Sequence, residues 1–170
     1  MERAHNMLRA CVVLLEEADR VIARHKTRLN RIVQGMNSVP GWVGARDAFL
    51  CYQRVMTQLE EAHVNKTSLW EAFVALRNWF RERNVNMSAV AVHYWALPDV
   101  LPDPVDPATM SAWEAAIAQC RARVARLELA LGLPERAALN AGDLDEADRV
   151  TEQRIGCRRL ILDIIRWLAG

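Results

Sequence analysis

Apolar residues recur at alternating spacings of three and four residues along the first part of the chain. This N-terminal seam consists of Leu8, Cys11, Leu15, Ala18, Ile22, His25, Leu29, Ile32 and Met36. Such a repeat predicts an α-helix that lies against a partner helix along its length. We expect one helix from about Arg3 to Met36, roughly 50 Å long at about 1.5 Å per residue. A compact domain of this size does not cover so long a helix, so we expect part of it to project or to contact another subunit.

The same spacing returns near the C-terminus, where a helix should run from near Pro107 or Thr109 to Gly132. Its apolar row is Met110, Trp113, Ile117, Cys120, Val124, Leu127 and Leu131. A final helix is expected from about Asp143 to Ala169, with a row made of Ala147, Val150, Arg154, Cys157, Ile161, Ile164 and Leu168. These two helices are predicted to form an antiparallel hairpin that keeps apolar surface for the first helix.

The middle of the chain predicts an amphipathic helix and a second, more apolar helix, separated by a loop. The first should cover about residues 45–63. Ser68 and Glu71 then have the spacing of a capping box, so the second helix should begin at Ser68, after a loop at residues 65–67. Its body is apolar on nearly every side, which is typical of a buried helix. A further short helix is expected over about residues 87–97.

A segment rich in proline and aspartate, residues 98–107, cannot continue a helix and is predicted to be an extended linker. No alternating apolar pattern of useful length predicts a strand. The sequence thus predicts an all-α fold, a helical bundle with a long N-terminal helix and a C-terminal antiparallel helical hairpin. A chain of 170 residues fits a single domain, residues 1–170, with a candidate sub-boundary at this linker.

The composition is that of an ordered globular protein, with 52% hydrophobic and 25% charged residues. No segment approaches the roughly 18 uninterrupted apolar residues of a membrane span, and the charged N-terminus does not resemble a signal peptide. The four cysteines are scattered without a C-x-x-C pair, so we expect small buried apolar residues in a reducing compartment. These features predict a soluble, intracellular protein, cytoplasmic or nuclear, with no membrane partner.

Arginine supplies nearly all of the positive charge, because Lys26 and Lys66 are the only lysines among 22 basic residues. The net charge of +1 predicts no nucleic-acid partner by itself. A basic stripe nevertheless follows one face of the first helix, and two arginines of the final helix could extend it. The candidate nucleic-acid-binding residues are Arg20, Arg24, Arg28, Arg31, Arg158 and Arg159. Such a stripe can follow a phosphate backbone, although ion pairing on a solvated helix is its ordinary role.

Catalytic patterns in the sequence are weak. Two E-x-x-H motifs, which end at His5 and His63, place a carboxylate and an imidazole on one helical face. Di-iron bundles use this motif, but they also need inward-facing glutamates from other helices, and none is evident. Arg20 and His25 fit the loose pattern of helical ribonucleases without a second half-site. Phosphate loops and nucleophile elbows do not occur. We predict no enzymatic activity, no catalytic residue, no metal and no cofactor.

The sequence therefore specifies a helical assembly better than an activity. The predicted protein-interface residues are the seam positions Leu8, Leu15, Ile22, His25, Leu29 and Ile32. A histidine in such a seam can set register or sensitivity to pH, but a partly exposed histidine is the more common outcome. We expect a homo-oligomer that acts by binding other proteins. The alternative is an oligomeric helical protein that binds nucleic acid, RNA in particular, through its arginine stripe.

Overall fold

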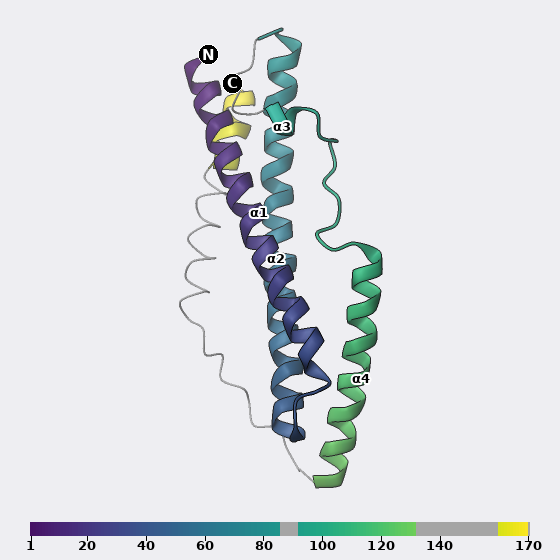
Figure 1. The fold of residues 1–170 in the computed structure, drawn as a ribbon. Helices are drawn as coiled ribbons and strands as arrows, with labels where there is room; N and C mark the ends of the chain where they lie inside the picture. Colours follow the sequence, from purple (N-terminus) through teal and green to yellow (C-terminus); the bar gives the residue numbers. More distant parts are fainter. Residues whose placement is uncertain (86–91, 132–159, 170) are drawn as a thin grey trace. The chain divides into compact units, whose positions relative to one another are not determined.

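The described part of the chain, residues 1–85, 92–131 and 160–169 of a computed structural model, is mostly helical (Figure 1). The labelled helices are α1 (Glu2–Met36), α2 (Gly41–Glu82), α3 (Val92–Trp95) and α4 (Pro107–Leu131). Residues 160–169 form a further helix. These ranges contain no strand, so the prediction of an all-α fold is confirmed.

Helices α1 and α4 begin and end within one or two residues of their predicted bounds. The helical residues 160–169 lie inside the predicted final helix. The predicted hairpin depends on residues 132–159, which lie outside the described part of the chain. The arrangement of the hairpin therefore stays a prediction. Cys157, Arg158 and Arg159 also lie in this undescribed segment.

Helix α2 contradicts the predicted loop at residues 65–67, because it continues without a break for 42 residues. The hydroxyl of Thr67 donates a hydrogen bond to the carbonyl of His63 at 3.0 Å, and the hydroxyl of Ser68 donates to the carbonyl of Val64 at 3.2 Å. Both hydroxyls thus bond within the preceding turn instead of capping a new helix. The predicted capping box at Ser68 is therefore wrong.

The described residues form two compact units. The aromatic unit consists of Met1–Val21 and the described residues of Ala62–Pro102 and Gly142–Gly170. The α4 unit consists of Ile22–Glu61 and the described residues of Asp103–Ala141. Helices α1 and α2 contribute to both units. One division, between Pro102 and Asp103, falls inside the segment predicted as a candidate sub-boundary.

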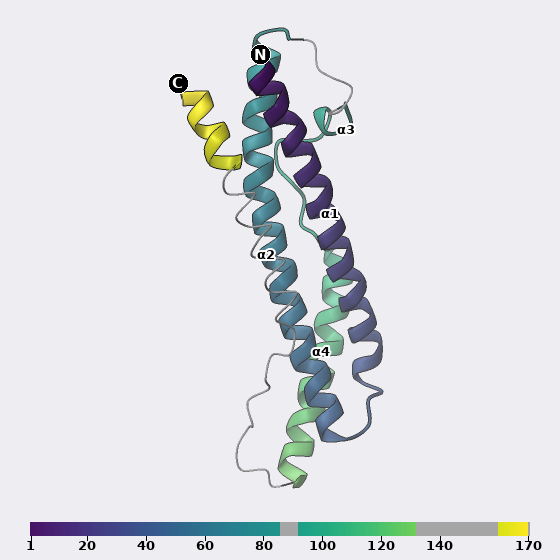
Figure 2. The same ribbon diagram turned by 90° about the vertical axis from the view of Figure 1, so that its left-hand side faces the viewer.

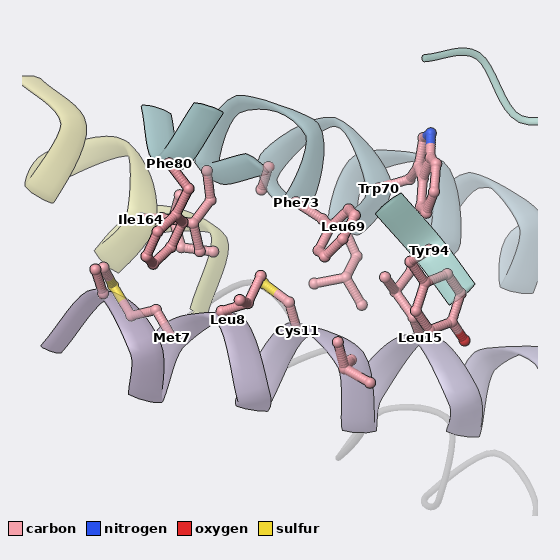
Figure 3. Close-up of a cluster of buried hydrophobic side chains, with 14 residues drawn as sticks. Met7, Leu8, Cys11, Leu15, Leu69, Trp70, Phe73, Phe80, Tyr94 and Ile164 are labelled. Atoms are coloured by element: carbon pink, nitrogen blue, oxygen red, sulfur yellow. The ribbon is translucent and has the colours of Figure 1, made fainter. Parts of the chain in front are cut away.

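The aromatic unit has a core of large side chains from α1, the second half of α2, α3 and the C-terminal helix (Figure 3). Its buried members are Ala4, Met7, Leu8, Cys11, Val12, Leu15, Leu69, Trp70, Ala72, Phe73, Leu76, Phe80, Tyr94 and Ile164. Trp70 stacks on Phe73 with ring centroids 5.2 Å apart, and Tyr94 meets both rings edge-on. Ile164 is fully buried and brings the C-terminal helix into this core.

A buried arginine holds the segment that follows α3 against α2. The side chain of Arg77 donates to the carbonyl of Leu97 at 2.8 Å and to the last two carbonyls of α3 at 3.4 and 3.5 Å. It also forms an ion pair with Asp99. The guanidinium thus adds a charged donor to carbonyls at and just beyond the end of α3, where the helix itself supplies few donors. The helix predicted over residues 87–97 ends at Trp95, where these bonds begin.

Tyr94 connects α3 to α1 through a carboxylate. Its hydroxyl donates to Asp19 at 3.3 Å, and the ammonium of Lys66 lies 2.6 Å from the other oxygen of Asp19. Burial, together with the Asp19 carboxylate, raises the pKa of Tyr94 to about 12. Asp19 therefore links α1 to both α2 and α3.

The α4 unit buries smaller side chains along narrower rows. Its buried residues are Ile22, His25, Leu29, Met36, Ala45, Tyr52, Val55, Leu59, Val105, Trp113, Cys120 and Val124. Figure 2 shows α4 alongside the first part of α2, to which it runs antiparallel. Asp106 caps α4 by accepting hydrogen bonds from the amide and the hydroxyl of Thr109 at 2.9 and 2.7 Å, and Pro107 follows at the first helical position.

Two glycines at the start of α2 shape the turn from α1 to α2. Gly41 has a φ of 72°, and a Cβ on Gly44 would overlap the side chain of Val39. Helix α4 holds this turn in place. The guanidinium of Arg123 donates to the carbonyl of Asn37 at 3.0 Å and to that of Val39, and the Asn37 amide donates to a carbonyl of α4 at 3.1 Å.

Candidate interaction surface on helix α4

Among the described residues, helix α4 packs against other helices on one side. Trp113, Cys120 and Val124 from the predicted row are buried, and Ile117 and Leu127 are half-buried. The indole nitrogen of Trp113 donates to Asn30 on α1 at 2.9 Å. The apolar row predicted for this helix is therefore largely buried by contacts within the chain.

A second row with the same spacing follows the opposite side of α4. This outer face consists of Ala108, Ser111, Ala115, Ala118, Ala122, Ala125 and Leu129, all of them exposed. Leu129 is 86% exposed, the largest value among the large apolar residues of the described chain. The row contains no charged residue over roughly 30 Å of helix, at about 1.5 Å per residue. Exposed helix faces are normally charged, so this face differs from an ordinary solvated one.

Charged residues border the outer face. Glu114, Arg121 and Glu128 follow one flank at intervals of seven residues, while Ala112, Gln119 and Arg126 follow the other flank. No ion pair joins these charges to one another or to other described residues. The guanidinium of Arg121 lies 6.0 Å from the ring centroid of Phe49 on α2. The order of charge along the first flank is negative, positive, negative.

Open grooves adjoin α4 on both flanks. One, of about 640 Å³, lies between α2 and α4, with Phe49, Leu50 and Val124 among its apolar lining and Arg121 and Glu128 among its charged lining. The other, of about 510 Å³, is lined by Asn37, Gln119, Ala122, Arg123 and Arg126. The flanking side chains of α4 therefore have room to change conformation.

The predicted interface residues are mostly buried inside the chain. Leu8, Leu15 and Leu29 are fully buried, Ile22 is 8% exposed and Ile32 is half-buried. Packing within the two units thus accounts for this burial, and a second copy is not needed to cover them. His25 is 2% exposed, so the expectation of a partly exposed histidine is wrong.

The structure separates the predicted arginine stripe into two groups. Arg20 pairs with Glu17 at 3.0 Å and with Glu16 at 3.9 Å. Arg24 and Arg31 are exposed and Arg28 is half-buried, and these three form no ion pair with any described residue. The last two members of the stripe, Arg158 and Arg159, lie outside the described ranges. Among the described members of the stripe, Arg24, Arg28 and Arg31 are therefore the ones without an ion pair.

Burial is the main cause of the raised pKa values of two side chains that pack near α4. Burial, and then the nearby Glu114 and Glu60, raise the pKa of Tyr52, and burial raises the pKa of the Cys120 thiol. Cys11 is also buried and Cys51 is half-buried, as expected for structural thiols.

The weak catalytic motifs gain no support from the geometry. The His5 ring packs edge-on against Phe80, 5.1 Å between centroids. In the described ranges, no three or more His, Cys, Asp and Glu side chains gather in a way that could hold a metal ion. Among the same residues, no helix combines the length and the apolar character that crossing a membrane requires.

Comparison of the chain with protein-family models, with curated proteins and with solved structures finds no match. The outer face of α4 was not predicted from the sequence, because the large apolar residues of this helix lie in the opposite row. The signal was nevertheless present: small residues at three-four spacing, with charges seven residues apart beside them.

Proposed function

We propose that this protein is a non-enzymatic helical assembly protein that acts through self-association and by binding other proteins. The observation that carries the proposal is the exposed, uncharged outer face of α4. Small side chains let a second helix approach closely, within the 8–10 Å interaxial distances typical of packed helices. A heptad-like row that no described element covers is the kind of surface that such a helix uses.

The proposal includes the finer arrangement predicted from the sequence, a single bundle-like domain with a C-terminal antiparallel hairpin. It includes no catalytic step, metal or cofactor. The assembly surface differs from the one predicted first, because seam residues such as Leu15 and Leu29 already pack inside the chain. In this proposal the outer face of α4, instead of the N-terminal seam, is the surface that contacts a second molecule.

Sedimentation equilibrium of the full chain over a range of concentrations tests the proposal. We expect the wild type to self-associate, and we expect Ala115→Arg with Ala122→Arg to shift it to monomer, because the two arginines would be buried without partners. The control, Val43→Arg, adds charge at an exposed apolar position of α2 and should not change the mass. A wild type that remains monomeric at all concentrations would exclude self-association.

A second candidate function, nucleic-acid binding and RNA in particular, is favoured by the arginines of α1 that lack ion pairs. Arg24, Arg28 and Arg31 recur at spacings of four and three, so their side chains point to one side of the helix. Guanidinium groups without carboxylate partners are available to phosphates. Oligomerisation would add their contributions along one strand.

The test is a mobility-shift titration with generic single-stranded and duplex RNA at several salt concentrations. Binding should weaken steeply with salt and should be lost when Arg24, Arg28 and Arg31 are changed to glutamate. Arg20→Glu is the matched control, because that guanidinium already pairs with Glu17. Absence of any shift at low salt would remove this candidate.

A further inference from the structure

The charges beside the outer face of α4 can select a partner and its orientation. In a heptad arrangement the outer face supplies the contacting rows, and Glu114, Arg121 and Glu128 occupy equivalent flanking positions. Flanking charges of this kind set the register and direction in which helices pair. They therefore allow different partners and directions to be compared.

An antiparallel pair of α4 helices brings identical flanks together. When Ala115 lies opposite Ala118 of the second copy, Glu114 faces Arg121 of the second copy. The two-fold axis repeats the contact, so Arg121 of the first copy faces Glu114 of the second. On the other flank Ala112 faces Gln119 of the second copy, which is a neutral contact. This register contains no pair of like charges and includes most of the length of α4.

Other arrangements are less favourable. A shift of the antiparallel pair by one heptad places Glu114 opposite Glu128 of the second copy. It also places Arg121 opposite Arg121 of the second copy. A parallel pair places Arg121 opposite Arg126 of the second copy, twice by symmetry. A shift by two heptads pairs Arg121 with Glu128 of the second copy, but only the end of α4 then overlaps. Like charges face each other in the first two arrangements, and the last one gives up contact area.

The local geometry leaves the charged side chains able to make these contacts. Glu114 and Arg121 are exposed, and neither forms an ion pair with a described residue. The Arg121 guanidinium, 6.0 Å from the Phe49 ring centroid, borders the groove of about 640 Å³ and has room to turn away from α2. Small residues along the outer face allow the close approach that brings the flanks within reach.

We propose that the partner of the outer face is the outer face of a second copy of this chain, packed antiparallel with Glu114 of each copy paired with Arg121 of the other. The inference rests on the proposed function, whose self-association it specifies. Its occupant is a second copy because the charge order of the flank is self-complementary.

Charge reversal on the full chain tests the pairing by sedimentation equilibrium. Glu114→Arg and Arg121→Glu, each alone, place like charges opposite each other twice, and each should weaken self-association by about tenfold or more. An equimolar mixture of the two variants should restore a dimer, because every contact then joins arginine to glutamate. The double variant E114R/R121E should also dimerise like the wild type. Circular dichroism confirms that each variant keeps its helix content.

Glu128→Arg is the matched control, since it makes the same change of charge on the same flank but outside the proposed pair. It should leave the dissociation constant within about threefold of wild type. Self-association that ignores both single reversals would overturn the antiparallel pairing and leave the proposed function standing. A wild type that never self-associates would overturn both.

Discussion

The aromatic unit and the α4 unit use the same two long helices to bury different kinds of surface. In the aromatic unit Trp70, Phe73 and Phe80 lie at most 1% exposed, and helices pack against them from several sides. In the α4 unit Trp113 and Val124 fill a narrow row, and α4 keeps its other side exposed. One pair of helices thus supports a core that several helices enclose and a helix, α4, with one exposed face.

Charged side chains also differ between the units, since the aromatic unit buries one and the α4 unit carries its charges nearer the surface. The guanidinium of Arg77 is buried and bonds to several carbonyls and to Asp99. The charges of α4, by contrast, lie at the surface, where Arg123 holds the turn between α1 and α2 and Arg121 is exposed. Removal of a buried polar group leaves its partners without bonds, whereas surface charges are solvated. The first unit should therefore be the more sensitive to substitution.

The largest expected effect is that of Phe73→Ala in the aromatic core. Loss of a fully buried aromatic side chain should lower the free energy of unfolding by about 3–5 kcal/mol. Val124→Ala in the α4 unit removes less buried volume and should cost about 1–2 kcal/mol. Urea denaturation followed by circular dichroism measures both, and equal costs would contradict the contrast between the units.

Arg77→Met should have the next largest effect. The carbonyl of Leu97 and Asp99 lose the Arg77 donor, and the carbonyls of Tyr94 and Trp95 each keep only one other donor. Unfolding should therefore become easier by about 2–3 kcal/mol. Arg81→Met is the matched change on the same helix. Arg81 is exposed and donates to a single carbonyl at 2.7 Å, so its loss should cost less than about 1 kcal/mol. The comparison fails if the two variants unfold at the same urea concentration.

The stability of the aromatic unit should fall at alkaline pH. The pKa of Tyr94 is raised to about 12 by burial and by Asp19, above its ordinary value of 10.0. The folded state therefore holds the phenolic proton more tightly than the unfolded state. The resulting stabilisation is complete below about pH 10 and is lost as the pH rises toward about 12. Thermal unfolding across this range should show a shallower decline for Tyr94→Phe, and parallel declines would refute the assignment.

The smallest effect is expected at the exposed start of α4. Hydrogen bonds from the hydroxyl and the amide of Thr109 lower the pKa of Asp106. The cap therefore stabilises the helix above the ordinary pKa of 3.8 and is lost as the pH falls through the lower folded value. Asp106→Ala should increase amide hydrogen exchange in the first turn of α4 at neutral pH. Asp103→Ala, just before the cap, is the control, and unchanged exchange in Asp106→Ala would exclude the capping role.

Local periodicity was enough to predict several elements. The three-four row from Leu8 to Met36 predicted α1, and the segment after the proline-rich linker predicted α4 nearly to its ends. The loop predicted at residues 65–67 is wrong, because the hydroxyls of Thr67 and Ser68 can either cap a new helix or bond to the preceding turn of a continuous one. The sequence does not distinguish these two roles. They bond back into α2, where Leu69 and Trp70 are packed in the aromatic core. Core packing on both sides of a weak point favours one continuous helix.

The sequence by itself determined that the chain is helical, where α1 and α4 lie, and that the charges at 114, 121 and 128 alternate, because these features depend on spacing within one segment. Only the tertiary structure decided that the outer face of α4 is exposed among the described residues, that the N-terminal seam packs inside its own chain, and that Arg77 is buried. Those outcomes depend on contacts between segments distant in sequence, where large apolar side chains gain the most from burial. The outer face of α4 stays exposed for the same reason, since its mostly small side chains have little apolar surface to bury.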